Sequence, residues 1–263
     1  MNEQRLGLSN RFMFAKVMVD NHDIAKTLIE SIIGKPIQEV SSVVKEQTFE
    51  DGVDKGIRID VCVTTKDGSL YDVELQVQLE KNIDKRTRYY KSTLTKHSIQ
   101  KGESYDKIKD TIVIFICMYD PFNKGSLMYH FKMHDEKHNL YLEGMDVYFL
   151  NATFKEPIDN ENIESLISVL HNEKADMPFA EKLTDAVNKA NADTEWRDRV
   201  MTLEMEMLHQ KHIGFEEGLE KGRKEERKDS ILKVLKKKSI SETADLFETS
   251  IEEIEEIAKE ASK

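Results

Sequence analysis

The chain has 263 residues, of which 34% are charged and 39% hydrophobic, and its formal net charge is −11. This length allows one well-buried core and a second, smaller module. No apolar run reaches the roughly 18 residues that a membrane span needs, and the opening segment MNEQRLGLSN lacks the apolar core of a signal peptide. We therefore expect a cytoplasmic protein that does not enter a membrane.

The negative charge is concentrated in the C-terminal part of the chain. Residues 1–150 hold 21 Lys and Arg against 23 Asp and Glu, whereas residues 151–263 hold 18 against 27. Within residues 81–101 there are seven bases and one acid. That basic segment is where a phosphate backbone would dock. Cys62 and Cys117 both lie in apolar runs, which predicts buried thiols and argues against a disulfide framework.

The N-terminal third predicts two short helices followed by strands. Residues 10–19 and 22–33 have helical patterns, and Gly34 and Pro36 end the second one. A strand is expected over residues 38–49, followed by a loop over 50–55.

The segment from Gly56 to Leu79 predicts a β-hairpin with an apolar face and an acidic face. Ile59, Val61 and Val63 alternate with Asp60 and Cys62, and after the turn Val73 and Leu75 alternate with acids and amides, namely Asp72, Glu74, Gln76 and Gln78. The carboxylate face has two interpretations: a solvent-exposed strand surface, or a binding site for a hard cation.

The turn decides which residues of the hairpin are paired. A two-residue Asp67-Gly68 loop would mix polar and apolar faces, whereas a three-residue loop over residues 66–68, with Gly68 left-handed, keeps the faces consistent. This register places Asp60 opposite Glu74. Two facing carboxylates repel each other unless a positive charge lies between them.

The following segment predicts a basic helix and further strands. A helix is expected over residues 84–100, with Asp84 as its N-cap, and an almost wholly apolar strand over 111–118. Residues 127–133 and 147–150 are further strands, so the order of elements indicates a mixed α/β fold.

His130, His134 and His138 recur every four residues, but their region alternates like strands, which favours surface histidines over a metal site.

From residue 160 onward the pattern is helical. Helices are expected over residues 163–170, 179–190 and 194–235, then two short amphipathic helices with Ser250-x-x-Glu253 as a capping box between them. Gly214, Gly218 and Gly222 lie four apart in the long helix, where each costs roughly 1 kcal/mol relative to Ala. Close helix packing between subunits would explain them, so we expect a homo-oligomer, a dimer, formed through the C-terminal helices.

Several motifs together resemble a known family. They are Arg58-Ile59-Asp60-Val61, Tyr71-Asp72-Val73-Glu74-Leu75-Gln76, Arg86-x-x-Tyr89-Tyr90 and the apolar strand ending in Asp120-Pro121-Phe122. In this order and spacing the chain is similar to the Rpn family of recombination-promoting nucleases and transposases, within the PD-(D/E)XK nuclease superfamily. The resemblance covers nearly the whole chain.

The resemblance implies a restriction-endonuclease-like αβββαβ core with a mostly helical C-terminal region, and Mg²⁺-dependent DNA cleavage, with Mn²⁺ as an alternative ion. Asp60 and Glu74 would be the metal-binding carboxylates, and Gln76 stands where the wider superfamily has a lysine. DNA contact is expected from the basic helix, through Arg86, Arg88, Tyr90 and Lys91.

The implied organisation has three parts: a nuclease-like domain over 1–155, a helical region over 156–235, and a small helical tail over 236–263. Two other functions stay open. The missing lysine and the acidic tail favour a catalytically weak or inactive nuclease fold that acts as a binding module through its C-terminal helices. A sugar- or phosphoester-processing enzyme with paired carboxylates is disfavoured because both acids lie on one hairpin.

Overall fold

The computed structural model describes residues 5–49 and 57–261, so the predicted loop over 50–55 lies outside the described residues. The chain forms two compact units, the first ending at Arg197 and the second beginning at Asp198. Among the described residues, no helix combines the length and apolarity that crossing a bilayer requires.

The first unit begins with the two predicted helices, α1 (Arg11–Asp20) and α2 (His22–Ile33). The Asn10 side chain accepts hydrogen bonds from the Phe12 and Met13 amides and so caps α1. Gly34, with φ +73°, ends α2 in the left-handed conformation.

The core of this unit is a six-stranded sheet in the order β1-β2-β3-β4-β6-β5. Its central strands β3, β4 and β6 run parallel, and the outer pairings are antiparallel. The αβββαβ order predicted from the sequence is confirmed. The strands are β1 (Val40–Phe49), β2 (Ile57–Thr65), β3 (Leu70–Gln76), β4 (Thr111–Cys117), β5 (Met128–His134) and β6 (Tyr141–Asn151).

The β2–β3 hairpin has the predicted three-residue loop. Cys62 pairs with Asp72 and Val61 with Val73, and Gly68 has φ +88°. Glycine adopts this left-handed backbone without the steric cost that a side chain would bring. Continued by one residue, the register brings Asp60 opposite Glu74, whose side chain accepts the Asp60 backbone N–H.

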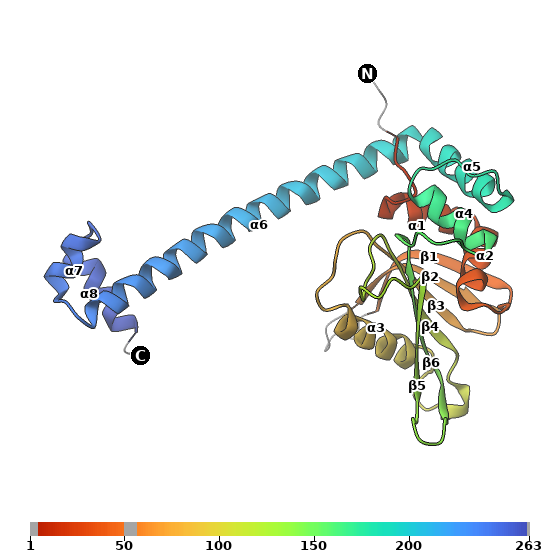
Figure 1. Cartoon of the computed structure of the whole chain (residues 1–263), viewed down its shortest axis with the longest axis horizontal. Coiled ribbons are helices and arrows are strands. Elements are labelled where there is room, and N and C mark those ends of the chain that lie inside the picture. Colours follow the sequence, from red (N-terminus) through yellow and green to blue (C-terminus); the bar gives the residue numbers. More distant parts are fainter. Residues whose placement is uncertain (1–4, 50–56, 262–263) are drawn as a thin grey trace. The chain divides into compact units, whose positions relative to one another are not determined.

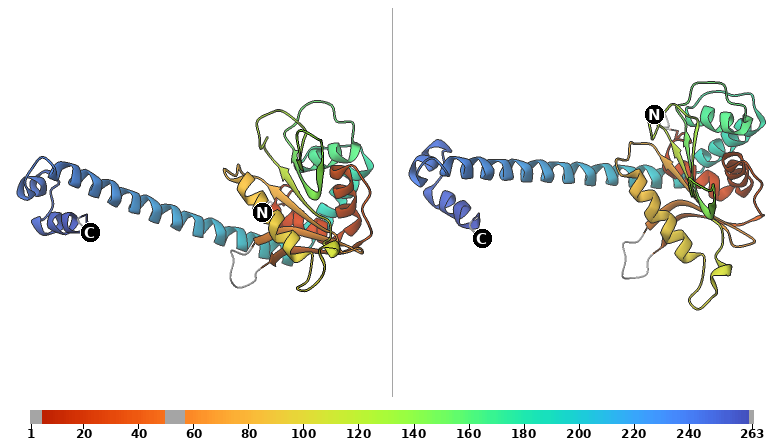
Figure 2. Two further views of the ribbon diagram at one scale, coloured as in Figure 1. Left: turned by 90° about the horizontal axis from the view of Figure 1, so that it is seen from below. Right: turned by 60° about the horizontal axis from the view of Figure 1, so that its bottom comes forward.

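Helix α3 (Ile83–His97) connects the parallel strands β3 and β4 and covers one face of the sheet, opposite α1 and α2 (Figure 1; Figure 2). Tyr90 and Leu94 of α3 pack on the β4 side chains that alternate toward them, including Val113 and Phe115. The predicted N-cap was wrong: α3 begins at Ile83 after Asn82, and Asp84 lies inside the first turn. A carboxylate there still favours the helix through the macrodipole.

The acidic face of the hairpin is the face that α3 covers. In the β3–β4 register Asp72, Glu74 and Gln76 lie beside Val113, Phe115 and Cys117, and those β4 residues belong to the α3 side of the core. Asp72 and Glu74 are fully buried. The solvent-exposed interpretation of this strand surface is therefore excluded. Cys62 and Cys117 are buried free thiols, as predicted.

Two further helices complete the first unit. Helix α4 (Glu161–Leu170) packs against α2, and α5 (Pro178–Ala192) packs against α1 and α4. Helices α1 and α2 contact the sheet on the face opposite α3, and α4 and α5 pack against them (Figure 2).

The second unit contains most of α6 (Thr194–Leu235), a single helix of 42 residues with the predicted bounds, followed by α7 (Ile240–Leu246) and α8 (Ile251–Glu260). Ile231, Ala244 and Ile254 form its small core. Ser250 caps α8 as predicted, but Glu253 turns to the Thr249 hydroxyl, and the complete capping box is Ser239 with Glu242 on α7. Apart from the local backbone of α6 itself, no described atom lies within 4 Å of an ideal Cβ on Gly214, Gly218 or Gly222.

Candidate active site

Three carboxyl groups gather on the α3 side of the hairpin. Asp60 comes from β2 and is half-buried, while Asp72 and Glu74 come from β3 and are fully buried. Burial, followed by the charges of neighbouring acids, raises the pKa values of Asp72 and Glu74, and Asp60 is one of those acids in both cases. The structure thus brings together Asp60 and Glu74, and it adds Asp72.

The Glu74 carboxylate is held by three different donors. One oxygen accepts the Asp60 N–H at 3.0 Å, and the other accepts the Arg86 guanidinium at 2.7 Å and the Gln76 amide at 3.2 Å. Burial, followed by the charge of Asp60, still raises the pKa of Glu74 to about 8 against the pull of Arg86.

Asp72 is the residue of this cluster that the sequence analysis did not select. As a carboxylate it accepts no hydrogen bond from a described N–H or hydroxyl group, and when protonated it donates to the Glu74 carboxylate. Burial, then the charges of Glu74 and Asp60, raises its pKa well above the ordinary value. The signal in the sequence was its alternation with Glu74, which puts both acids on one face of β3.

Arg86 brings a positive charge to Gln76. Its guanidinium lies 3.4 Å from the Gln76 amide oxygen and 2.7 Å from Glu74, and it stacks 4.8 Å from the Tyr90 ring centroid. Burial raises the pKa of Tyr90 to about 12, so its phenol stays protonated. Gln76 itself carries no charge, but α3 places a cation directly beside it.

The four residues predicted to contact DNA have different environments. Arg86 and Tyr90 face the acidic cluster, and Arg88 is exposed on α3. Lys91 is only 3% exposed, and its ammonium group donates to the carbonyl and hydroxyl of Thr111 at the start of β4. Burial lowers the pKa of Lys91 to about 8.

The three histidines at four-residue spacing do not converge. His130 bonds Asp146 at 2.6 Å, His134 stacks on Tyr141, and His138 bonds Asp135 in the turn after β5. Within the described ranges, no group of three or more His, Cys, Asp or Glu side chains has a geometry that would hold a metal ion. A site at Asp60 and Glu74 would therefore have two side-chain ligands.

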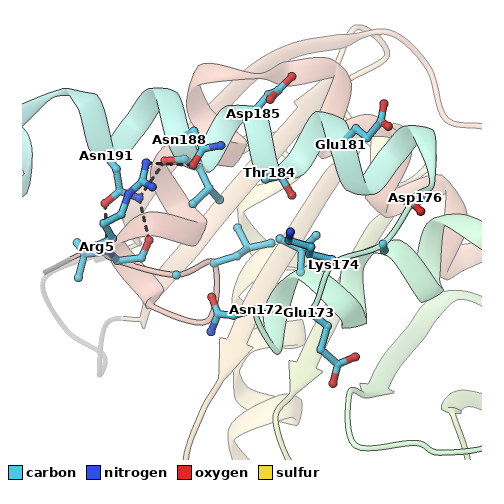
Figure 3. Close-up of a pocket in the computed structure, with 16 residues that line it drawn as sticks. Arg5, Asn172, Glu173, Lys174, Asp176, Glu181, Thr184, Asp185, Asn188 and Asn191 are labelled. Atoms are coloured by element: carbon cyan, nitrogen blue, oxygen red, sulfur yellow. Dashed lines mark hydrogen bonds between the residues drawn. The ribbon is translucent and has the colours of Figure 1, made fainter.

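Two hollows lie away from the acidic cluster. A polar pocket of about 520 Å³ borders α5 and the N-terminal segment (Figure 3). At its edge Arg5 donates a hydrogen bond to Asn188, and the Asn191 side-chain amide both accepts from the Leu6 N–H and donates to the Leu6 carbonyl. Those contacts fix the N-terminal segment. A groove of about 810 Å³ between α3 and the β5–β6 hairpin is lined by Arg88, Lys91 and apolar side chains such as Phe131.

A comparison with family models matches residues 9–211 to the PD-(D/E)XK nuclease family transposase. The chain belongs to this family. Comparisons with curated proteins and with solved structures found no match. Membership in the PD-(D/E)XK nuclease family transposases agrees with the mixed α/β sheet and its αβββαβ order, and nucleases of this superfamily typically use divalent metals.

Proposed function

We propose that the chain is a metal-dependent DNA endonuclease that hydrolyses phosphodiester bonds and is associated with recombination or mobile elements. The observation that carries the proposal is the meeting of Asp60 and Glu74 on one face of the hairpin, with the Arg86 guanidinium beside Gln76. Family membership supports the reaction class.

The residues at this site fit a hard divalent cation such as Mg²⁺, with Mn²⁺ as the alternative. All donors are oxygens, and burial, followed by the charges of neighbouring acids, raises the pKa values of Asp72 and Glu74, an unfavourable environment for carboxylates that a cation would relieve. Asp60, Glu74 and a backbone carbonyl near Leu75 would hold the ion. A cation in this position supplies an acidified water and charge stabilisation on the phosphate oxygens.

Gln76 and Arg86 divide the role that a single lysine has elsewhere in the superfamily. The Gln76 amide lies against Glu74 and orients the attacking water or the phosphate. Arg86 neutralises Glu74 in the structure described and, from the same place, presents its guanidinium to a phosphate oxygen.

DNA docking is assigned to the exposed basic side of α3. Arg88 is exposed there with Lys85, and both belong to the segment that holds seven bases and one acid. Lys91 supports this surface from beneath, because its ammonium group is bound to Thr111. A phosphate backbone would follow the exposed bases toward Arg86.

Plasmid nicking tests the proposal. We expect Asp60→Asn and Glu74→Gln to reduce the rate of Mg²⁺-dependent nicking by at least about 100-fold, because each removes charge where the cation and phosphate meet. Arg86→Lys should retain more activity than Arg86→Met. Asp106→Asn, an exposed acid outside the site, is the matched control. Wild-type rates in both acid variants, with unchanged circular dichroism, would remove these residues from the mechanism.

A second function has an observation of its own. Glu74 is already bound by Arg86, Gln76 and the Asp60 amide, as it would be in a nuclease fold that has become a binding module. Titration calorimetry with Mg²⁺ and Mn²⁺ separates the two, since the binding module takes up neither ion.

We also propose that the chain forms a homodimer through its C-terminal helices.

A further inference from the structure

The middle of helix α6 packs against no other part of the described chain closely enough to bury a side chain. Val200, near the start of α6, and Ile231, in the second unit's core, are buried, but no residue from 201 to 230 is buried. Large apolar side chains are nevertheless exposed along it. A helix that exposes such side chains over several turns needs a partner to cover them. The exposed apolar side chains of this stretch are Leu203, Met205, Met207, Leu208, Phe215 and Leu219, each at least 46% exposed.

Part of this stretch has the spacing of a coiled-coil seam. Steps of four and three residues alternate without a break from residue 201 to residue 222, and five of the seven positions are large and apolar. This 3.5-residue period keeps one stripe facing a second helix along its whole length. The seam consists of Met201, Met205, Leu208, His212, Phe215, Leu219 and Gly222.

We infer that residues 201–222 form a parallel, in-register two-stranded coiled coil with the same residues of a second copy of the chain. In that orientation Lys211, beside the seam, faces the partner's Glu216, and the pair occurs twice by symmetry. An antiparallel pair could use the same seam residues, with Met205 beside the partner's Gly222. Glu204 would then face the partner's Glu225, and these like charges would repel each other. Charge therefore selects the parallel form.

His212 occupies a central position of the seam. It is exposed and lies 3.3 Å from Glu216 on the same helix. A polar residue at one inner position costs stability but fixes the register and the number of strands. The seam begins four residues after Arg197, the last residue of the first unit, so a parallel pair joins two nuclease-fold units at one end. This pairing supplies the contact surface of the homodimer proposed above, on which it rests, and it does not require catalytic activity.

Cysteine cross-linking of the full-length chain tests both the pairing and its direction. Met205→Cys should form a disulfide-linked dimer under mild oxidation, because identical inner positions face each other only in a parallel, in-register pair. Gln210→Cys, on the opposite side of the helix, is the matched control and should stay uncross-linked. The native thiols are buried and give little background. As a further test, the Met205→Cys protein is mixed with the Gly222→Cys protein. If this mixture forms a disulfide-linked dimer and Met205→Cys alone does not, the pair is antiparallel and the inference is overturned.

Light scattering and sedimentation equilibrium test the seam without oxidation. The wild type should be a dimer at micromolar concentration, and Phe215→Glu should raise the dissociation constant at least about 100-fold. His212→Leu should lower it, because the inner polar layer is removed. Phe215 is exposed in the single chain, so Phe215→Glu leaves the fold intact, and circular dichroism checks this. A monomeric wild type, or a Phe215→Glu variant with unchanged mass, would refute the seam.

Discussion

Asp72 is the most unfavourably placed ionisable residue of the candidate site. Its carboxyl group is fully buried, and as a carboxylate it accepts no hydrogen bond from a described donor; only the protonated form is satisfied, by donating to Glu74. Burying such a group is tolerated only if it is protonated or if a cation is close by. The raised pKa of Asp72 indicates the protonated form in the absence of metal, with the charges of Glu74 and Asp60 as contributing causes after burial.

Asp72→Asn should therefore stabilise the protein at neutral pH. The folded state keeps a proton on Asp72 above pH 4 whereas the unfolded state loses it, so wild-type stability falls as the pH rises, by up to about 1.4 kcal/mol per pH unit. The amide does not titrate. In urea unfolding with chelator, the variant should exceed the wild type by on the order of 1 kcal/mol or more at pH 7.5, and by much less at pH 4.5. An equal difference at both pH values would contradict this account; Asp106→Asn is the control.

The cations of α3 show what sequence can and cannot reveal about single residues. The cluster of bases predicted an electropositive helix, but not which side chains turn inward. Arg86 is bound to Glu74 and Lys91 to Thr111, while Arg88 stays exposed. That choice depends on the height and rotation of α3 over β3 and β4, which are set by Ile83 and Leu94 packing on the sheet.

At the level of elements, the hairpin was predictable because two local constraints agree. The alternation of polar and apolar residues and the glycine needed at position 68 permit the same register, and the structure has it. The covering of the acidic face was not predicted, because polar residues on a strand suggest solvent. Tyr90 and Leu94 four apart on α3 were the available sign of a face that needs burial.

The turn glycine can be tested against a helix glycine. Gly68→Ala should destabilise the first unit by about 1–2 kcal/mol, because alanine is strained at φ +88° and its Cβ would lie 3.4 Å from Lys109. Gly214→Ala should stabilise α6 by up to about 1 kcal/mol, because the φ of Gly214 is ordinary and no described atom outside the local helix backbone lies near an added Cβ. Urea unfolding followed by Trp196 fluorescence reports the first change, and helical circular dichroism the second. Two shifts of the same sign would contradict the conformational explanation.

At the scale of the whole molecule, the two units differ greatly in how much they bury. The first has a six-stranded sheet covered on both faces, whereas the core of the second consists of Ile231, Ala244 and Ile254 with a few partly buried neighbours. A core of that size gives only marginal stability. The dimer seam proposed above would add stability to α6 by mass action, so the second unit should melt at a temperature that rises with protein concentration.

Ile254→Ala separates the units experimentally. Ile254 is fully buried at the centre of the second core, so the truncation should cost about 2–5 kcal/mol and unfold α7 and α8 at lower temperature. The first unit shares none of that core, and its transition, followed by the single tryptophan Trp196, should not move. Ile251→Ala, an exposed position on the same helix, is the matched control and should change little. In calorimetry the wild type should show two transitions and Ile254→Ala should shift one of them. If Trp196 fluorescence and the α7–α8 transition shifted together, the two units would fold as one cooperative body.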